Sequence, residues 1–512
     1  MLLCAFVSAG WAWQGAQNPE VVAPLRRYIP GASIPTRFRL LGTILDKEVK
    51  RVEDAITKRM KGSYTTTQSD GWKNIQHTHL LVFMVTGNSK VRVTHLANVS
   101  AQRKNALGLY ELMKDELECN ASELGLINIG FVSDTSGKCR STRLMLHAEF
   151  PQYLVANCYA HQIQLVVGDY MKRNPAIRSY IEQAVEIVKW FNTHSYALRM
   201  FMEEQKTLTK HPLKLITPFI IRWTTHCLAI TRLLHLHTPL QTLAMKHHDE
   251  LVDSVGMKTK SVSKAKRIMN YISDQSLWEH LREIKSHLQP LAVAAHVTQA
   301  ADTRADHVLL MFGKLFKRWA KADQDIFIAA VYLNPFVKST LFSHSMSPII
   351  IHSIVWTLYT RVFQKNKNEI PPKLGKRLMQ YHNRTGPFSS VYWGPEQLKE
   401  MYGQVKRFYR SVAVWNLQDT QQPLARVAIL ILSFICNSAG CERLFSVMGD
   451  IQTKKQNRLN PEKTCKTATV KLDILREHAI SGHAPARKKR RIVRLELAGP
   501  WKALGNLICW IS

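Results

Sequence analysis

The spacing of hydrophobic residues divides the chain into a β-rich segment and longer helical segments. Continuous or alternating runs of β-branched and apolar residues predict strands at 64–68, 80–86, 91–99, a run from Ile127 that ends at Asp134, and 153–158. Amphipathic spacing predicts helices at 101–118, at 141–149 and from 161 onward. The predicted order is therefore three strands, a helix, a strand, a helix, a strand and a helix.

This order is the layout of an RNase H-like fold, an α/β fold whose mixed sheet joins a three-stranded antiparallel meander to parallel strands. In that layout the first and fourth strands are neighbours. Asp70 lies near the end of the first strand and Asp134 at the end of the fourth. We therefore expect these two carboxylates to lie close together in space.

Helical periodicity continues through most of the remaining chain, so the protein is predicted to be α-rich overall, with an all-α domain inserted into the sheet domain. The apolar residues at the N-terminus predict a short helix that packs on the core, and no run is long and apolar enough for a membrane span. The predicted organisation is 1–62 N-terminal helices, 63–175 first part of the sheet domain, 176–423 all-α insertion, 424–480 C-terminal region with the last helix of the sheet domain, and 481–512 basic tail.

Charge narrows the possible partners. The 512 residues include 70 Lys and Arg against 38 Asp and Glu, a net charge of +32, which predicts a polyanionic partner such as nucleic acid. Nine cysteines occur without C-x-x-C pairs, which argues against a disulfide framework or a paired-cysteine zinc finger and fits a reducing compartment. A basic cluster near the C-terminus predicts either a nuclear localisation signal or a phosphate-binding tail: Arg487, Lys488, Lys489, Arg490 and Arg491.

Two adjacent carboxylates are unfavourable unless cations lie between them, which is the requirement of a two-metal phosphoryl-transfer site. Such a site usually needs a third carboxylate, and Glu442 is the candidate because small residues surround it just before a helix. From the residues alone Asp302, Asp306 and others compete with it, and an ordinary exposed glutamate is the favoured interpretation of Glu442.

Several motifs occur in one order along the chain. They are NPEVVAPL at 18–25, IPTRFRL at 34–40, SDGW at 69–72, IGFVSD at 129–134, CYAHQIQL at 158–165, RW at 222–223, LNP at 333–335 and SAGCERLFS at 438–446, which leads into NRLNPEKT. In this combination the chain resembles the hAT superfamily of DNA transposases and their domesticated relatives with BED-type zinc fingers.

The resemblance implies a function and a set of site residues. Asp70, Asp134 and Glu442 match the family's DDE triad, which binds two Mg²⁺ or Mn²⁺ ions and catalyses phosphodiester cleavage and strand transfer. It also implies DNA as the partner, a nuclear location, and a homo-oligomer, dimer or higher, formed through the C-terminal region.

Two further motifs of the resemblance suggest contacts with DNA. Cys158 and His161 match a C-x-x-H motif near the active site; a contact with the scissile strand and a buried core pair are both open, and half a zinc site is the weaker reading. Arg222 and Trp223 match the RW motif, whose indole could stack on a flipped base or pack between helices.

Two departures from the family pattern define an alternative. Thr135 occupies the position of the family's usual Asn after the second Asp, and no BED finger motif precedes the first predicted strand. The alternative is a truncated, catalytically inactive transposase-derived protein that binds DNA and dimerises.

Overall fold

The structure is a computed structural model, and it divides the chain into two compact units that are described separately. One unit comprises residues 1–159 and 298–512, and the other comprises residues 160–297. The described residues are 2–29, 31, 33–88, 90–101, 105–208, 211–218, 223–299, 303–312, 324–337, 347–389, 393, 397–398, 411–453 and 459–482. The basic cluster 487–491 lies outside them.

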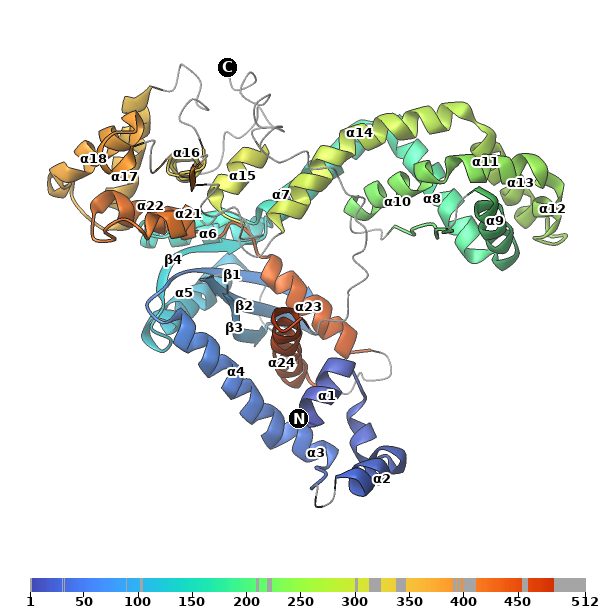
Figure 1. Ribbon diagram of the computed structural model, residues 1–512, viewed down its shortest axis with the longest axis horizontal. Helices are drawn as coiled ribbons and strands as arrows, with labels where there is room; N and C mark the ends of the chain where they lie inside the picture. The colour runs from blue at the N-terminus through green and yellow to red at the C-terminus, as the bar shows by residue number, and fades with distance from the viewer. Residues whose placement is uncertain are drawn as a thin grey trace. The chain divides into compact units, whose positions relative to one another are not determined.

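A five-stranded mixed sheet forms the centre of the first unit (Figure 1). Its strands are β1 Tyr64–Lys73, β2 His79–Gly87, β3 Lys90–Asn98, β4 Ile127–Ser133 and β5 Leu154–Asn157. They lie in the order β3-β2-β1-β4-β5, with β1, β2 and β3 antiparallel and β1, β4 and β5 parallel. The predicted order of elements and the adjacency of the first and fourth strands are therefore both present, in an α-rich α/β protein.

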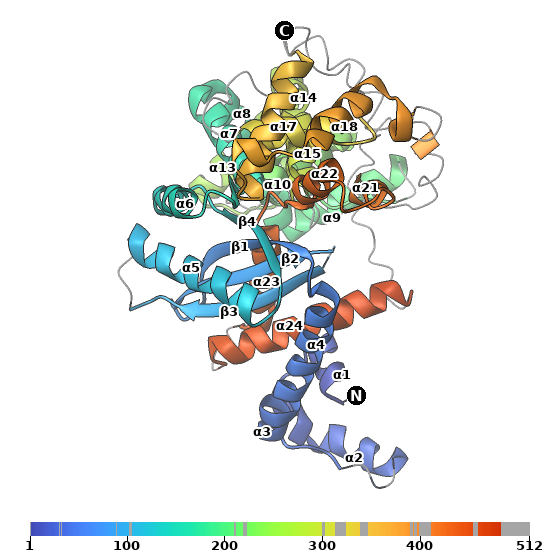
Figure 2. The ribbon, with the colours of Figure 1, turned by 90° about the vertical axis from the view of Figure 1, so that its left-hand side faces the viewer.

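Helices cover both faces of the sheet (Figure 2). They are α5 Ala106–Ser122 and α6 Gly137–Glu149 on one face, and α23 Ala439–Ile451 and α24 Pro461–Ile480 on the other. Alternate residues of β2 point to opposite faces, as a pleated strand requires. Val82 and Met84 pack against α23 and α24, whereas Phe83 packs against α5 and α6.

The N-terminal helices attach to the last helix of the unit. They are α1 Leu2–Ala9, η1 Trp13–Gln17, α2 Pro19–Tyr28, α3 Arg37–Arg39, η2 Leu40–Ile44 and α4 Leu45–Met60. Leu3 and Phe6 of α1 are buried in a cluster with Val470 of α24, so the apolar N-terminus packs on the core as expected. Asp46 of α4 accepts from the Nζ atoms of Lys463 and Lys466 at 3.0 and 2.9 Å.

The remaining helices among the described residues of this unit precede α23 in the chain. They are α15 Ala305–Phe312, α16 Gln324–Tyr332, α17 Pro348–Val362, η4 Lys367–Glu369, α18 Pro372–Asn383, η5 Gly386–Phe388, α21 Ser411–Trp415 and α22 Pro423–Ser433. Tyr381, Phe388, Trp393 and Trp415 pack ring against ring, with centroids 5.0–6.2 Å apart.

The second unit is entirely helical in its described residues. It contains the helices from α7 to α14: α7 Tyr159–Arg173, α8 Pro175–Thr193, α9 Ser195–Leu208, α10 Trp223–His235, α11 His237–Lys246, α12 His248–Asp253, α13 Thr259–Ser273 and α14 Gln275–Thr298. This unit is shorter than the all-α domain predicted for 176–423, because residues from 298 onward group with the sheet. Within the described part of the chain, every helix is too short or too polar to span a bilayer.

Candidate functional site

Strand register brings Asp70 and Asp134 to the same edge of the sheet. The parallel β1–β4 ladder ends at the pair Gln68 and Val132. Asp70 lies two residues after Gln68, and Asp134 lies two residues after Val132. Asp70 still belongs to β1, which continues beyond its expected end because it pairs with β2 as far as Lys73. Both side chains are half-buried.

A backbone N–H that follows each aspartate binds one oxygen of its carboxylate. The backbone N–H of Gly71 donates to Asp70 Oδ1 at 2.8 Å, and that of Ser136 donates to Asp134 Oδ1 at 3.0 Å. Ser136 then caps α6, accepting from the backbone N–H of Cys139 at 3.4 Å. The bond from Ser136 is an Asx-type turn, the local geometry that a short carboxylate favours at the start of a helix.

A strap of residues 434–438 carries the third carboxylate toward this edge, and Glu442 lies half-buried in the first turn of the helix that follows, α23. Three segments hold the strap by four hydrogen bonds. Ile435 N–H donates to Thr66 Oγ1 (3.0 Å) and Cys436 N–H to Thr303 O (2.9 Å), while Cys436 O accepts from Tyr159 N–H (3.1 Å) and Cys158 Sγ from Ser438 N–H (3.4 Å).

A glycine lets α23 approach the sheet closely. A Cβ atom at Gly440 would lie 3.1 Å from Gln68 Oε1 and 3.3 Å from Val91 Cγ1. One turn farther along, the ring of Phe445 stacks on Trp72 with centroids 5.5 Å apart. The small residues that favoured Glu442 in the sequence therefore have a packing reason as well.

The negative charges of Glu442 and Asp134 both affect the pKa of the Asp70 carboxyl. Burial raises the pKa of Asp70 to about 7, the negative charge of Glu442 adds to the increase, and Asp134 contributes less. The hydrogen bond from Gly71 opposes the shift. The charges of Glu442 and Asp134 therefore both act on Asp70, and a metal site shared by the three carboxylates stays a prediction.

The arrangement of these carboxylates is not that of a complete set of metal ligands. Among the described residues, no three His, Cys, Asp or Glu side chains are grouped so that they could bind one ion. The donor chemistry of three carboxylates nevertheless suits Mg²⁺ or Mn²⁺, which prefer oxygen ligands. The charge of Glu442 also disfavours the ionised form of Asp70, an effect that a cation would offset.

Arg143 is a site residue that the sequence did not indicate. Its buried guanidinium donates to Ser133 Oγ (2.6 Å), to Asp134 O and to Asn157 Oδ1, so it joins the ends of β4 and β5. Burial lowers its pKa, and nearby negative groups including Asp134 oppose that change. An arginine on an amphipathic helix usually reads as a solvent-exposed residue, so periodicity gave no signal for it.

The other predicted site residues occupy varied positions. Cys158 is buried and supports the strap, and His161 lies half-buried in α7; their roles in DNA binding stay predictions. Arg222 lies outside the described residues, and of Trp223 only the backbone is described, where α10 begins.

Asp302 and Asp306 competed with Glu442 as the third carboxylate, and their outcomes differ. Asp302 lies outside the described residues, whereas Asp306 is fully buried and forms a bidentate ion pair with Arg304 at 3.2 Å. Burial alone would raise the pKa of Asp306, but Arg304 and His307 lower it below its ordinary value. A carboxylate already paired in this way is poorly suited to a metal.

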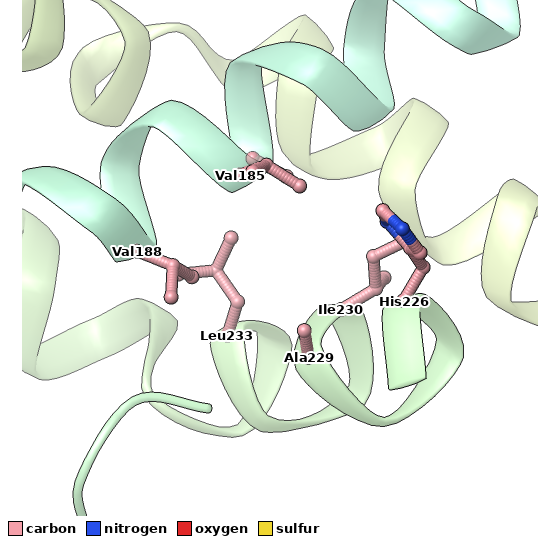
Figure 3. Close-up of a pocket in the computed structure, with 7 residues that line it drawn as sticks. Val185, Val188, His226, Ala229, Ile230 and Leu233 are labelled. Carbon is pink, nitrogen blue, oxygen red and sulfur yellow. The ribbon is translucent and has the colours of Figure 1, made fainter. Parts of the chain in front are cut away.

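A pocket in the helical unit has a different character (Figure 3). Its lining is apolar except for His226 and comes from α8 and α10: Ala184, Val185, Val188, His226, Ala229, Ile230 and Leu233. The space does not admit a water molecule. Burial lowers the pKa of His226, as expected for an imidazole among aliphatic side chains. We regard this pocket as a packing gap.

Comparison with known proteins adds a family for part of the chain. No curated protein matches it. Residues 35–187 match the family described as "Domain of unknown function (DUF659)", a family associated with hAT-type transposases. The match contains the whole sheet with Asp70 and Asp134, whereas Glu442 lies outside it. The sheet of this protein therefore lies within the part of the chain that is similar to DUF659.

Proposed function

We propose that this chain is an hAT-like transposase or a protein derived from one, which binds DNA and cleaves and joins phosphodiester bonds in the nucleus. The observations that carry the proposal are that Asp70 and Asp134 each lie two residues past the last paired position of the adjacent parallel strands β1 and β4, and that the charge of Glu442 helps to raise the pKa of Asp70. The strand order and directions match those expected for an RNase H-like fold, which supports the proposal.

In this proposal Asp70, Asp134 and Glu442 hold two divalent ions, Mg²⁺ or Mn²⁺. The ions would activate a water or a 3′-hydroxyl and neutralise charge on the phosphate. The protein contributes the positions of the ligands: the Asx-type turn orients Asp134, Arg143 holds the ends of β4 and β5 together, and the strap aims Glu442. The raised pKa of Asp70 means that a nearby cation would favour its ionised, ligating form.

A metal-dependent nicking assay tests the proposal. The full chain is incubated with supercoiled plasmid and Mn²⁺, and conversion to nicked or linear DNA is followed on a gel. We expect cleavage that EDTA abolishes and that falls at least a hundredfold in Asp134→Asn. The matched control is Asp249→Asn, since the Asp249 side chain is 97% exposed and lies in the helical unit. Equal cleavage by wild type and Asp134→Asn would exclude the triad.

A non-catalytic DNA-binding and dimerising protein is the second candidate. The lack of a ready-made ligand group among the described residues favours it. It predicts DNA binding and self-association without metal-dependent cleavage. The strongly apolar α22 is already buried within the chain, so a dimer formed by the C-terminal region would use α24, where Leu475 and Ile480 are exposed. Light scattering of Leu475→Ser/Ile480→Ser tests this: a dimer is lost in the variant.

A further inference from the structure

The two short helices α2 and α3 expose aromatic rings beside arginines. Tyr28, the last residue of α2, is 75% exposed, and Phe38 in α3 is 70% exposed. The guanidinium carbon of Arg27 lies 5.7 Å from the Tyr28 ring centroid, and that of Arg37 lies 4.6 Å from the Phe38 ring centroid. Each ring therefore has a cation at its face and its remaining surface open to solvent.

Both helices are anchored on the same support, η1. Trp13 of η1 is buried and stacks with Phe6 of α1 at 6.3 Å, which fixes η1 to the core. Asn18 caps α2 by accepting from Glu20 N–H at 2.9 Å, and Arg37 donates to Gln14 Oε1 at 2.5 Å. Figures 1 and 2 both show α2 and α3 at the end of α4 that lies away from the sheet.

Charge on this surface is one-sided. Arg26, Arg27, Arg37 and Arg39 occur between residues 21 and 45, a stretch without Asp or Glu. Within the described part of the chain, none of these four arginines forms an ion pair with a carboxylate. Cations that the protein itself leaves uncompensated are available to an anionic ligand.

The combination selects nucleic acid over other occupants. Exposed rings provide stacking platforms for bases, and adjacent arginines contact phosphates and add cation–π attraction. A membrane-bound helix needs a continuous exposed apolar face, whereas Val21, Val22 and Leu25 of α2 are half-buried and the exposed rings are separated by arginines. A second copy of this chain, with a net charge of +32, would meet like charge.

We propose that this surface, formed by Arg26, Arg27, Tyr28, Arg37, Phe38 and Arg39, binds single-stranded or unpaired DNA through base stacking on Tyr28 and Phe38. The inference rests on the proposed function, since it takes DNA as the partner. It assigns the contact to the N-terminal helices, apart from the three carboxylates.

Fluorescence anisotropy with a labelled 30-nucleotide single strand tests the proposal, using the full chain in EDTA so that no cleavage occurs. We expect Tyr28→Ala/Phe38→Ala to weaken binding at least tenfold, because stacking on one aromatic ring is worth about 1–3 kcal/mol per base. The matched control is Ile349→Ala/Met379→Ala, which removes two exposed apolar side chains of the same unit (79% and 51% exposed). It should bind as tightly as wild type.

Three results would overturn the proposal: equal affinities of the ring variant and wild type, absence of binding by wild type, or loss of affinity in both double variants. Two parallel experiments measure binding to vesicles that contain phosphatidylserine and, by light scattering, dimerisation of the chain. Vesicle binding or dimerisation that is lost only in the ring variant, with DNA affinity unchanged, would assign the surface to a membrane or a second copy. If the ring variant bound DNA as tightly as wild type and still nicked plasmid, the nuclease proposal would stand and the proposal of base stacking on Tyr28 and Phe38 would be wrong.

Discussion

Asp70 links the stability of the fold to the chemistry of the site. Its pKa is about 7 in the folded chain, against an ordinary value of 3.8, because burial and the charge of Glu442 disfavour the ionised form. Well below pH 3.8 the carboxyl is protonated in both states and contributes nothing. As the pH rises toward 7 the unfolded chain ionises first, so folding stability falls, by at most about 4 kcal/mol.

Asp70→Asn should therefore stabilise the metal-free protein in a pH-dependent way. The amide keeps an oxygen that accepts from Gly71 N–H, but it carries no charge. We expect the free energy of unfolding to rise by about 1–4 kcal/mol at pH 8 and by less than about 1 kcal/mol at pH 4. Urea denaturation followed by tryptophan fluorescence measures both. An equal increase in the free energy of unfolding at both pH values, or no increase, would show that ionised Asp70 does not destabilise the fold.

Gly130 is a second residue whose identity is dictated by its surroundings. A Cβ atom there would lie 2.1 Å from Leu154 O and 2.5 Å from the Phe434 ring, at the junction of β4, β5 and the strap. We predict that Gly130→Ala lowers the free energy of unfolding by about 1–3 kcal/mol or more, because β4 must move away from both neighbours. Gly137→Ala, where nothing lies within 4 Å, should change it by less than about 0.5 kcal/mol in the same urea titration.

Among the elements, the strap depends on a buried ion pair. Arg304 forms an isolated β-bridge with Ile435, and its guanidinium also donates to Ser411 Oγ at 3.2 Å. Its partner Asp306 accepts from Asn334 Nδ2 at 2.8 Å. The pair therefore joins the start of α15 and the first residue of α21 to the strap that leads to Glu442.

Removal of Arg304 should loosen that connection. Arg304→Met leaves Asp306 buried without its cation, a change that costs about 3–5 kcal/mol, and we expect faster amide exchange at residues 434–438. Arg304→Met/Asp306→Leu removes both charges and should recover most of the lost stability. Hydrogen–deuterium exchange with mass spectrometry gives the local effect, and urea denaturation the global one. If the single variant exchanged like wild type, the pair would not hold the strap.

The sequence predicted individual strands and helices better than the contacts between segments that are distant along the chain. Strand positions followed from periodicity, because each strand has a distinct apolar pattern, and the adjacency of β1 and β4 followed from the order of the elements. The choice of Glu442 depended on the family resemblance, since the strap that precedes it is held by bonds that join residues up to 369 positions apart. Arg143 was missed because a buried charge is recognisable only when its partners, such as Asn157, are known.

For the whole molecule, the charge of +32 should dominate binding to DNA. If the protein neutralises six to ten phosphates, its affinity should fall by about 10³–10⁵ between 50 and 200 mM salt, because condensed counterions are released on binding. Anisotropy titrations of a labelled duplex at four KCl concentrations give the slope. A flat dependence on salt would mean that the excess of Lys and Arg does not contact the phosphate backbone.

The two bonds of Cys436 have a consequence for how this protein can vary. Its carbonyl accepts from Tyr159, where the chain departs from the sheet unit, and its amide donates to Thr303, where the chain has just returned. Departure and return are thus tied to a single amino acid. An inserted segment whose two ends are held close together can be lengthened, shortened or replaced at little entropic cost to the rest of the fold. Residues 160–297 are accordingly the natural place for a designer to excise a module or graft a foreign one.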